Sequence, residues 1–138
     1  MRVLVAPAAN YAWIAEKAQL VITPQFRALE AVEGDKIMGM VGFDGFTPNA
    51  LSLHIALENP YALLSLAKIG FQWAFKMRAV AIAPVISTNK RSVRLVEGLG
   101  FKPCGRLKDA WMPGVDVCFY QMRRDECRFL KEAERWAA

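Results

Sequence analysis

The chain has 138 residues, of which 54% are hydrophobic and 22% are charged, and its net charge is +5. This length and composition predict one globular domain with a packed core and exclude a disordered chain. The longest apolar runs fall short of the roughly 20 residues that a membrane-spanning helix needs, so we expect no membrane partner. The basic excess favours an anionic partner, and a phosphorylated cofactor, nucleic acid or an acidic surface would each satisfy it.

Cysteine and histidine usage argues against a metal site. Cys104, Cys118 and Cys127 are odd in number and lack CxxC spacing, and His54 is the single histidine. These residues predict neither a disulfide framework nor a zinc site. Free thiols in a reducing compartment explain them most simply, so we expect a cytoplasmic protein without a metal.

The first third of the chain predicts a strand, a helix and a hairpin. Residues 2–6 form a short apolar strand, and Asn10 then caps a helix. Residues 26–32 and 36–43 are strand-like. The turn between them contains Gly34, which tolerates a positive φ.

The middle of the chain predicts a strand, a long helix and a further strand. Apolar and more polar residues alternate over 51–58, which is typical of a strand with one buried face. Pro60 suits the first position of a helix that runs to about Lys76. Residues 79–86 form the next strand, whose pairing direction stays open. The buried stripe of the long helix is predicted to be Leu63, Leu64, Ala67, Phe71, Ala74 and Phe75.

The next segment predicts a capped helix that turns directly into a strand. Asn89 is placed to accept a hydrogen bond from amides of the first helical turn, and Gly100 supplies a left-handed stop. Val96 and Leu99 share the apolar face of this helix. Residues 101–107 and 115–122 then read as a closing hairpin.

This capped segment resembles the C-terminal signature of the GNAT superfamily of acyl-CoA-dependent N-acyltransferases. In that family an Asn opens the helix, a small residue follows three positions on, here Ser92, and a Gly-Phe pair closes it, here Gly100 and Phe101. The order of predicted elements agrees with the family over nearly the whole chain. The resemblance implies an α+β fold with a mixed, splayed central sheet flanked by helices, as one domain over residues 1–138.

Residues 125–138 are extra to the family pattern and predict a C-terminal amphipathic helix. Its apolar side chains are Phe129, Leu130, Ala133 and Trp136. We expect Phe129, Leu130 and Trp136 to be buried against the body or against a second subunit of a homodimer, because such a stripe would otherwise be an exposed apolar patch.

The resemblance implies acetyl-CoA as co-substrate. In the family the pantetheine arm lies where the fourth and fifth strands part at their C-terminal ends. A proline at position 84 would be tolerated there, and the backbone at Val85 and Ile86 would contact the ligand. An ordinary strand end or bulge at Pro84 is the alternative.

The phosphates of the cofactor would lie at two helix starts. Free amides at the start of the long helix attract anions, although the family's glycines are missing and Glu58 would repel phosphate. Basic side chains at the start of the next helix are the second contact, with solvation of an exposed face as the alternative. The predicted cofactor residues at these two places are Tyr61, Ala62, Leu63, Leu64, Asn89, Lys90, Arg91 and Arg94.

Amine acetylation needs a general base, and Glu58 and His54 are the candidates. They share a strand face but stand roughly 13 Å apart, so they form no dyad. We favour Glu58, which lies near the family's usual carboxylate, while a helix-start acid and a packed histidine are the structural alternatives. The resemblance places Val96 where the family often has a tyrosine that protonates the departing thiolate, and valine cannot donate a proton. Tyr120 and Cys104 are the fallback proton donors, with a structural role in the core as the alternative for each.

These features predict a GNAT-like N-acetyltransferase that acts on an unspecified small-molecule or protein amine. The alternative is a catalytically inactive protein of the GNAT fold with a binding or structural role, for example phage or virion associated. Nucleic-acid binding through the basic surface is the third hypothesis, which we do not favour because no recognition motif accompanies the charge.

Overall fold

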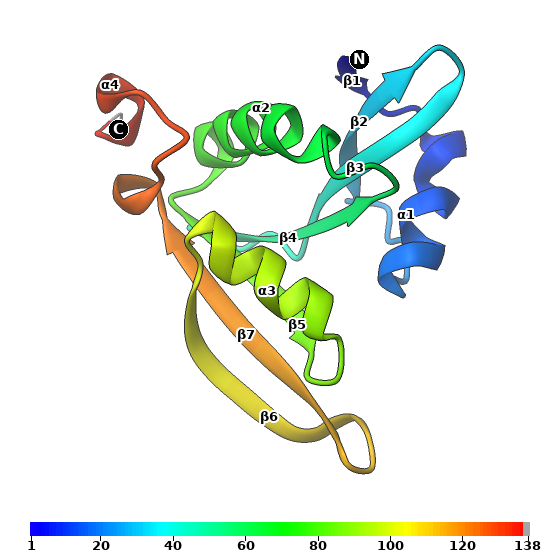
Figure 1. Ribbon diagram of the computed structural model, residues 1–138. Coiled ribbons are helices and arrows are strands. Elements are labelled where there is room, and N and C mark those ends of the chain that lie inside the picture. Colours follow the sequence, from blue (N-terminus) through cyan, green and yellow to red (C-terminus); the bar gives the residue numbers. More distant parts are fainter. Residues whose placement is uncertain (137–138) are drawn as a thin grey trace.

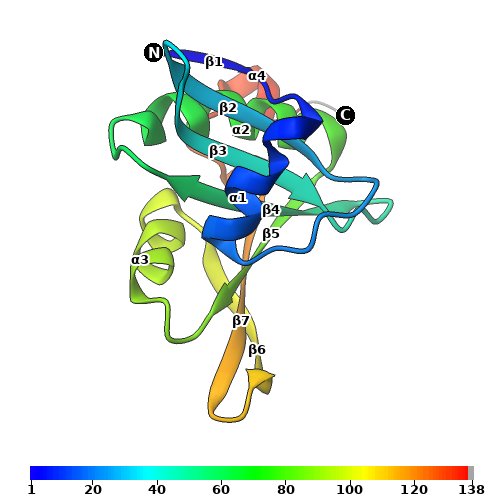
Figure 2. The same cartoon turned by 90° about the vertical axis from the view of Figure 1, so that its right-hand side faces the viewer.

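The computed structural model describes residues 1–136 and contains one seven-stranded mixed sheet in the order β1-β2-β3-β4-β5-β7-β6. Helix α1 covers one face of the sheet, and α2 and α3 lie on the other (Figures 1 and 2). The strands are β1 (Arg2–Val5), β2 (Arg27–Glu33), β3 (Lys36–Asp44), β4 (Ala50–Leu57), β5 (Val80–Ile86), β6 (Lys102–Met112) and β7 (Val115–Arg123). The helices are α1 (Tyr11–Ala18), α2 (Ala62–Met77), α3 (Lys90–Leu99) and α4 (Glu132–Arg135), with short 3-10 turns η1 (Ala8–Asn10) and η2 (Arg124–Glu126).

The predicted strands and the α+β class are confirmed. The hairpin turn between β2 and β3 holds Gly34 at φ +61°, which is the positive φ that the sequence predicted. Both termini of helix α3 are as predicted. At its start the Asn89 side chain accepts from the Ser92 amide at 3.1 Å, and at its end Gly100 takes a φ of +107°. Strand β6 is longer than expected and reaches Met112.

Two helix starts differ from the sequence prediction. Asn10 precedes α1, but its side chain makes no cap; its Nδ2 donates to Glu30 Oε1 at 2.9 Å. Glu30 is a buried carboxylate on β2, and a buried charge needs a donor more than a helix terminus does. Helix α2 begins at Ala62, because Asn59 to Tyr61 form a turn and leave Pro60 outside the helix.

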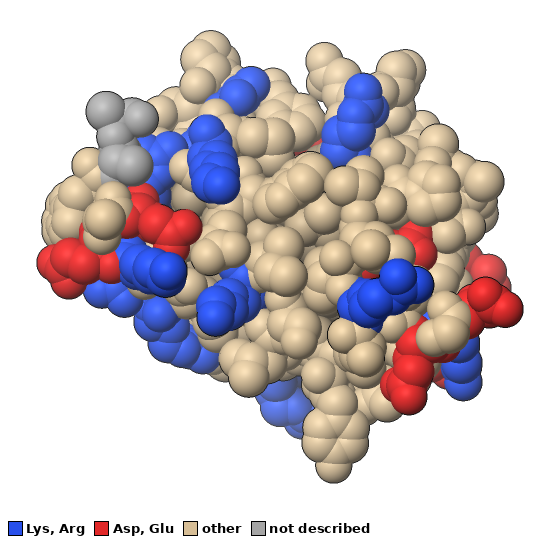
Figure 3. Space-filling model, turned by 90° about the horizontal axis from the view of Figure 1, so that it is seen from above, with Lys and Arg blue, Asp and Glu red and all other residues tan. Residues whose placement is uncertain are grey.

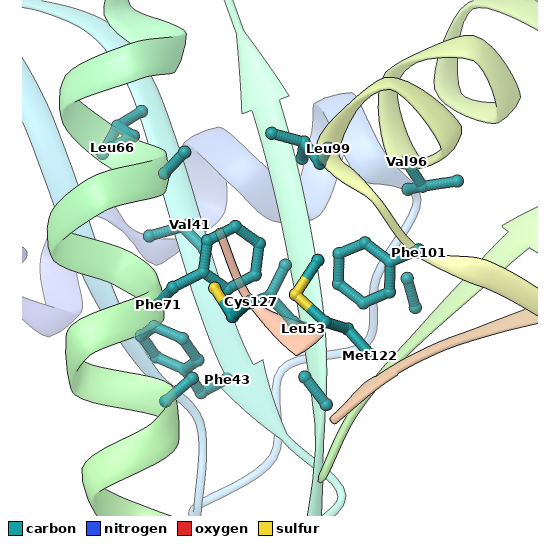
Figure 4. Close-up of a cluster of buried hydrophobic side chains, with 14 of the residues drawn as sticks. Val41, Phe43, Leu53, Leu66, Phe71, Val96, Leu99, Phe101, Met122 and Cys127 are labelled. Atoms are coloured by element: carbon teal, nitrogen blue, oxygen red, sulfur yellow. The ribbon is translucent and has the colours of Figure 1, made fainter. Parts of the chain in front are cut away.

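The main core lies between the sheet and helices α2 and α3 (Figure 4). Phe71 is its centre: the ring stacks on Phe129 at 5.3 Å between centroids and meets Phe101 at 5.9 Å. The predicted stripe of α2 is wrong at Leu64, which is 69% exposed, and it missed Leu66, which is fully buried. Leu66 is buried because Gly39 on β3 lets the helix approach closely; a Cβ at Gly39 would lie 2.8 Å from Leu66 Cδ1.

A second, smaller core lies under α1. Ile14 of this helix and Phe26, which precedes β2, are both completely buried. The ring of Phe26 lies directly over Gly42 of β3, and Tyr11 packs edge-on against it at 4.9 Å between centroids. This core fixes α1 beside β4, the strand that matters most for the site.

The C-terminal segment corrects the prediction of one continuous helix over 125–138. The described part consists of the η2 turn, an irregular stretch and the four-residue α4, and positions 137 and 138 lie outside the described residues. Leu130 is buried and Phe129 packs on the core, as predicted, whereas Trp136 is exposed on this chain. Two guanidinium–carbonyl bonds from Arg128, to Leu99 at 3.0 Å and to Gly98 at 2.7 Å, tie the segment to the end of α3.

Replacing Gly42 with alanine tests the second core. The added Cβ would overlap the Phe26 ring, so we expect Gly42→Ala to lower the free energy of unfolding by about 1–3 kcal/mol. Gly98→Ala is the matched control, because nothing lies within 4 Å of its added Cβ and alanine stabilises a helix interior by roughly 0.5–1 kcal/mol. Urea denaturation measures both; a Gly42→Ala protein as stable as Gly98→Ala would contradict the packing described.

Candidate functional site: a cleft between β4 and β5

Strands β4 and β5 run parallel but pair at only three positions, ending at Ser52 and Ile82. Beyond that point each strand continues alone, to Leu57 and to Ile86. A cleft of about 440 Å³ lies between them, so the splay expected from sequence is present. Its lining comes from α1 and the residues after it (Lys17, Ala18, Gln19, Leu20), from β4 (53–57), β5 (83–86), Asn89, α3 (Arg91, Ser92, Leu95, Val96) and the β6–β7 hairpin (Trp111, Val117).

Hydrogen bonds to β7 show which backbone groups of β5 face this cleft. The Ser87 amide donates to Asp116 at 2.9 Å, and the Ala79 carbonyl accepts from Arg124 at 2.9 Å. Alternate residues of an antiparallel strand point toward the same neighbour, so Val85 faces β7 while Pro84 and Ile86 face β4. Pro84 therefore removes no bond from the ladder, and its carbonyl and the Ile86 amide point into the cleft.

The opposite wall follows the same rule. The Glu58 amide donates to Met38 of β3 at 2.9 Å, which assigns even-numbered residues of β4 to β3. The backbone groups of Ile55 and Leu57 consequently face the cleft. Both walls thus present main-chain donors and acceptors to any ligand that enters.

His54 lies on β4 and lines the cleft. Its Nε2 lies 2.8 Å from Asp44 Oδ1, and the two side chains are only 10% and 17% exposed. An ionised carboxylate only accepts, so Nε2 carries the hydrogen and a neutral imidazole keeps its lone pair on Nδ1. Among the described residues no side-chain nitrogen or oxygen is buried without a hydrogen-bond partner, and none of these residues bonds Nδ1, so this atom is not completely buried.

Glu58 is less suited to the role of base that the sequence suggested. Its Oε2 accepts from Lys17 Nζ at 2.9 Å, and it does not line the cleft. The hydrogen bond and the charge of Lys17 lower the pKa of Glu58 below its usual value. A carboxylate with a lowered pKa is a weaker base, so the structure favours His54 over Glu58.

Neither fallback proton donor reaches the cleft. Tyr120 is 7% exposed and belongs to the main core, where burial raises the pKa of its phenol. Cys104 lies on the outer strand β6, and its Sγ contacts the Phe119 carbonyl at 3.4 Å. This arrangement gives no support to Tyr120 as a catalytic acid, whereas Val96 does line the cleft.

The start of α2 is closed rather than open to an anion. The Tyr61 amide donates to Asn59 Oδ1 at 2.9 Å, the Ala62 amide to the Asn59 carbonyl at 3.0 Å and the Leu63 amide to the Pro60 carbonyl at 3.1 Å. Three of the four amides predicted to bind phosphate, those of Tyr61, Ala62 and Leu63, are thus already bonded. The predicted phosphate contacts of these three amides are therefore corrected, and only the contact predicted for the Leu64 amide stays an expectation.

A second groove of about 620 Å³ runs between α2 and α3 and shares Leu57, Arg91 and Leu95 with the cleft. Arg94 also lines this groove, so two predicted phosphate contacts lie along one continuous path. Asn89 lines the cleft while capping α3. Lys90 is exposed and lines neither hollow, so its predicted contact has no support from this arrangement.

The β6–β7 hairpin adds a residue that sequence reasoning missed. Residues 108–111 of β6 bulge out opposite Asp116 of β7. The Asp116 carboxylate accepts from the Asp109 amide at 2.9 Å and from Arg106, and these contacts lower the pKa of Asp116, the Asp109 amide most. The bulge places Trp111 in the cleft wall. The only sequence signal was an aromatic residue just before the Pro113–Gly114 turn.

Charged side chains on the face seen in Figure 3 are dispersed. On the face shown in Figure 3, Lys and Arg side chains stand in separate groups with large uncharged areas between them. Within residues 1–136 no group of three or more His, Cys, Asp or Glu side chains is placed to hold a metal ion. Across the same residues, each helix is too short or too polar to cross a membrane.

Comparison with solved structures identifies the fold. The structure of smu.2055 from Streptococcus mutans superposes with a TM-score of 0.72 at 18% identity, covering 89% of this chain and 99% of that chain. The spermidine/spermine N-acetyltransferase SpeG from Vibrio cholerae gives a TM-score of 0.70 at 12% identity, over 88% and 91% of the two chains. yncA from Salmonella typhimurium, named a candidate acetyltransferase and solved with its cofactor acetyl-CoA, gives 0.68 at 17% identity, over 89% and 93%.

No protein-family model matches the sequence, and a comparison with curated proteins gives no match. The structural likeness is nevertheless extensive, since the superpositions span most of both chains. The chain therefore has the fold of the GNAT acetyltransferases, as its sequence resemblance implied.

The Lys17–Glu58 pair predicts a measurable titration. Glu58 is held ionised by Lys17, so the pair persists above the lowered pKa of Glu58 and is lost as the pH falls through it. In Lys17→Met we expect the pKa of Glu58 to rise toward its ordinary value, followed by NMR of the side-chain carboxyl carbon. Lys36→Met is the control, since Lys36 contributes less to the shift. A Glu58 that titrates identically in the parent and in Lys17→Met would refute the assigned cause.

Proposed function

We propose that the protein is an N-acetyltransferase that moves the acetyl group of acetyl-CoA to an amine. The observation that carries this proposal is the parting of β4 and β5, which opens main-chain groups of both strands beside a histidine–aspartate pair. The same fold in acetyltransferases, one of them solved with acetyl-CoA, supports it. Fold alone does not determine activity, so the case for acetyl transfer also depends on which residues line the cleft.

The cleft fits the amide-containing arm of the co-substrate. The Pro84 carbonyl and the Ile86 amide, with the backbone of Ile55 and Leu57 opposite, supply the donors and acceptors that such an arm needs. Arg91 then stands where the cleft meets the second groove, and Arg94 lies further along it. We assign the phosphates to these two guanidinium groups, because the α2 terminus is closed and guanidinium binds phosphate in a bidentate manner.

His54 is the general base in this proposal. One proton leaves the substrate ammonium for His54 Nδ1 and then for solvent, while Asp44 stabilises the imidazolium through Nε2. The amine nitrogen attacks the thioester carbonyl carbon, the C–N bond forms, and the C–S bond breaks. The second proton moves to the departing thiolate, so the products are the N-acetylamine, the CoA thiol and one released proton.

Val96 lies in the cleft wall, and a valine side chain has no proton to donate to the departing thiolate. A positioned acid contributes typically 10²–10⁴-fold, so we expect slow turnover. Val96 and the closed start of α2 are the two observations that support the alternative hypothesis. In that hypothesis the protein keeps the fold for binding or structure and has lost the chemistry. Oligomeric state and a cytoplasmic location stay predictions from the sequence.

Binding of acetyl-CoA separates these two hypotheses. A ligand at about 100 times its dissociation constant adds roughly 2.7 kcal/mol to the free energy of unfolding, so a thermal melt should rise with millimolar acetyl-CoA. Arg91→Ala should weaken this binding, and Arg123→Ala, on the far end of β7, is the control with the same loss of charge. A folded protein that shows neither a calorimetric signal nor a shifted melt would support the inactive alternative.

Separate replacement of the two candidate bases by glutamine tests the mechanism. We expect His54→Gln to lower kcat/KM for amine acetylation by 10²–10⁴-fold while leaving acetyl-CoA affinity unchanged. Glu58→Gln should change kcat/KM by less than about threefold, since Glu58 bonds Lys17 and lies outside the cleft lining. The reverse pattern, with Glu58→Gln inactive and His54→Gln active, would restore Glu58 as the base.

A further inference from the structure

The lining of the cleft also specifies the acceptor, given the acetyl transfer proposed above. We propose that the acceptor is a primary amine with a flat apolar body, of the arylalkylamine class, which packs against Trp111, and that polyamines are poor acceptors. The inference rests on three features of the cleft: an aromatic ring carried on a hydrogen-bonded bulge, a largely apolar lining and the absence of an available carboxylate among its described lining residues.

Trp111 is exposed to solvent on a backbone bulge that hydrogen bonds hold in place. It remains 44% exposed although it sits in the cleft wall. The bulge that carries it is fastened at several points: Asp116 binds the Asp109 amide at 2.9 Å, Asp109 Oδ1 accepts from the Gly114 amide at 2.8 Å, and the Asp116 amide donates to Ser87 Oγ at 2.9 Å. A large aromatic side chain on a well-anchored backbone offers contact area at little entropic cost, because it has few rotatable bonds.

The cleft that Trp111 lines also has several apolar residues in its walls. Val117 of β7 lies in the same wall, and Leu20 and Ala18 contribute from the end of α1. His54, the proposed base, lines the same cleft, so an amine near Nδ1 can extend its body toward these side chains. Binding sites of this kind favour ligands with a mostly apolar surface and one polar group.

Charge in the cleft argues against a polyamine. Lys17 and Arg91 are basic and line it, and no Asp or Glu occurs among its described lining residues. The two carboxylates that contact lining side chains are already engaged: Glu58 bonds Lys17 at 2.9 Å and Asp44 bonds His54 at 2.8 Å. Since Glu58 neutralises Lys17 and Arg91 is assigned to phosphate, a ligand with several ammonium groups would meet no available anion among the described lining residues.

This arrangement contrasts with the substrate named for one structural neighbour. SpeG from Vibrio cholerae is a spermidine/spermine N-acetyltransferase with the same fold. A shared fold does not carry a shared acceptor, because the acceptor is selected by side chains at the open end of the cleft. Trp111 and the paired carboxylates therefore predict a different acceptor class here.

Three amines test the proposal: 2-phenylethylamine, ethylamine, which lacks only the ring, and spermidine. CoA release should show a kcat/KM for 2-phenylethylamine at least tenfold above that for the other two, because about 1.4 kcal/mol of aromatic packing corresponds to tenfold. Trp111→Ala should remove this preference, mainly through KM, and Trp111→Phe should keep part of it. Leu107→Ala is the control, an equally exposed apolar residue on β6 outside the lining, and should keep the full preference.

Calorimetric titration of 2-phenylethylamine into the protein, with and without CoA, keeps this inference separable from the proposed function. Binding that Trp111→Ala weakens about tenfold and Leu107→Ala leaves intact would support the acceptor site even if no turnover occurred. Acetylation of spermidine or ethylamine at least as efficient as that of 2-phenylethylamine would overturn the acceptor class while leaving acetyl transfer in place. Absence of 2-phenylethylamine binding in both titrations would overturn it as well.

Discussion

The separation of β4 and β5 after three paired positions is the constraint on which the rest of the structure depends. A parallel pair this short leaves main-chain groups on two strands without a strand partner, in the middle of a sheet where backbone groups are normally bonded. Pro84 reduces that deficit by one donor, since its nitrogen faces the gap. The remaining groups form a ligand-sized opening rather than a packing defect, because α2, α3 and α1 support both walls.

Both faces of the sheet contribute to this opening. On one side α3 supplies Arg91 and Val96 to the lining, and on the other the end of α1 supplies Lys17, which binds Glu58. The same ion pair that neutralises the α1 end of the cleft lowers the pKa of Glu58, which makes its carboxylate a weaker base and leaves His54 as the other candidate. This ion pair is the reason why our proposal assigns proton transfer to His54 rather than to Glu58.

Local patterns in the sequence were sufficient for the strands and the α3 cap, because alternation and a capping Asn each have a direct backbone cause. The splay at Pro84 was expected only from the family resemblance, since a strand proline alone also fits an ordinary strand end. Features that depend on distant partners were not predictable. Glu58 meets Lys17 across 41 positions, and the Trp111 bulge depends on Asp116. The prediction of phosphate binding at the start of α2 failed for another reason. The Asn59 side chain accepts from the Tyr61 amide, a local contact that helix-dipole reasoning alone does not anticipate.

Amide hydrogen exchange at Ile86 tests the central claim most directly. The Ile86 amide faces the cleft, whereas the Val85 amide points toward β7, so in the free protein Ile86 should exchange faster than Val85. Acetyl-CoA at saturation should slow exchange at Ile86 by at least tenfold and leave Val85 little changed. Unchanged exchange at Ile86 in a protein that demonstrably binds acetyl-CoA would place the ligand elsewhere and contradict the role assigned to the parted strands.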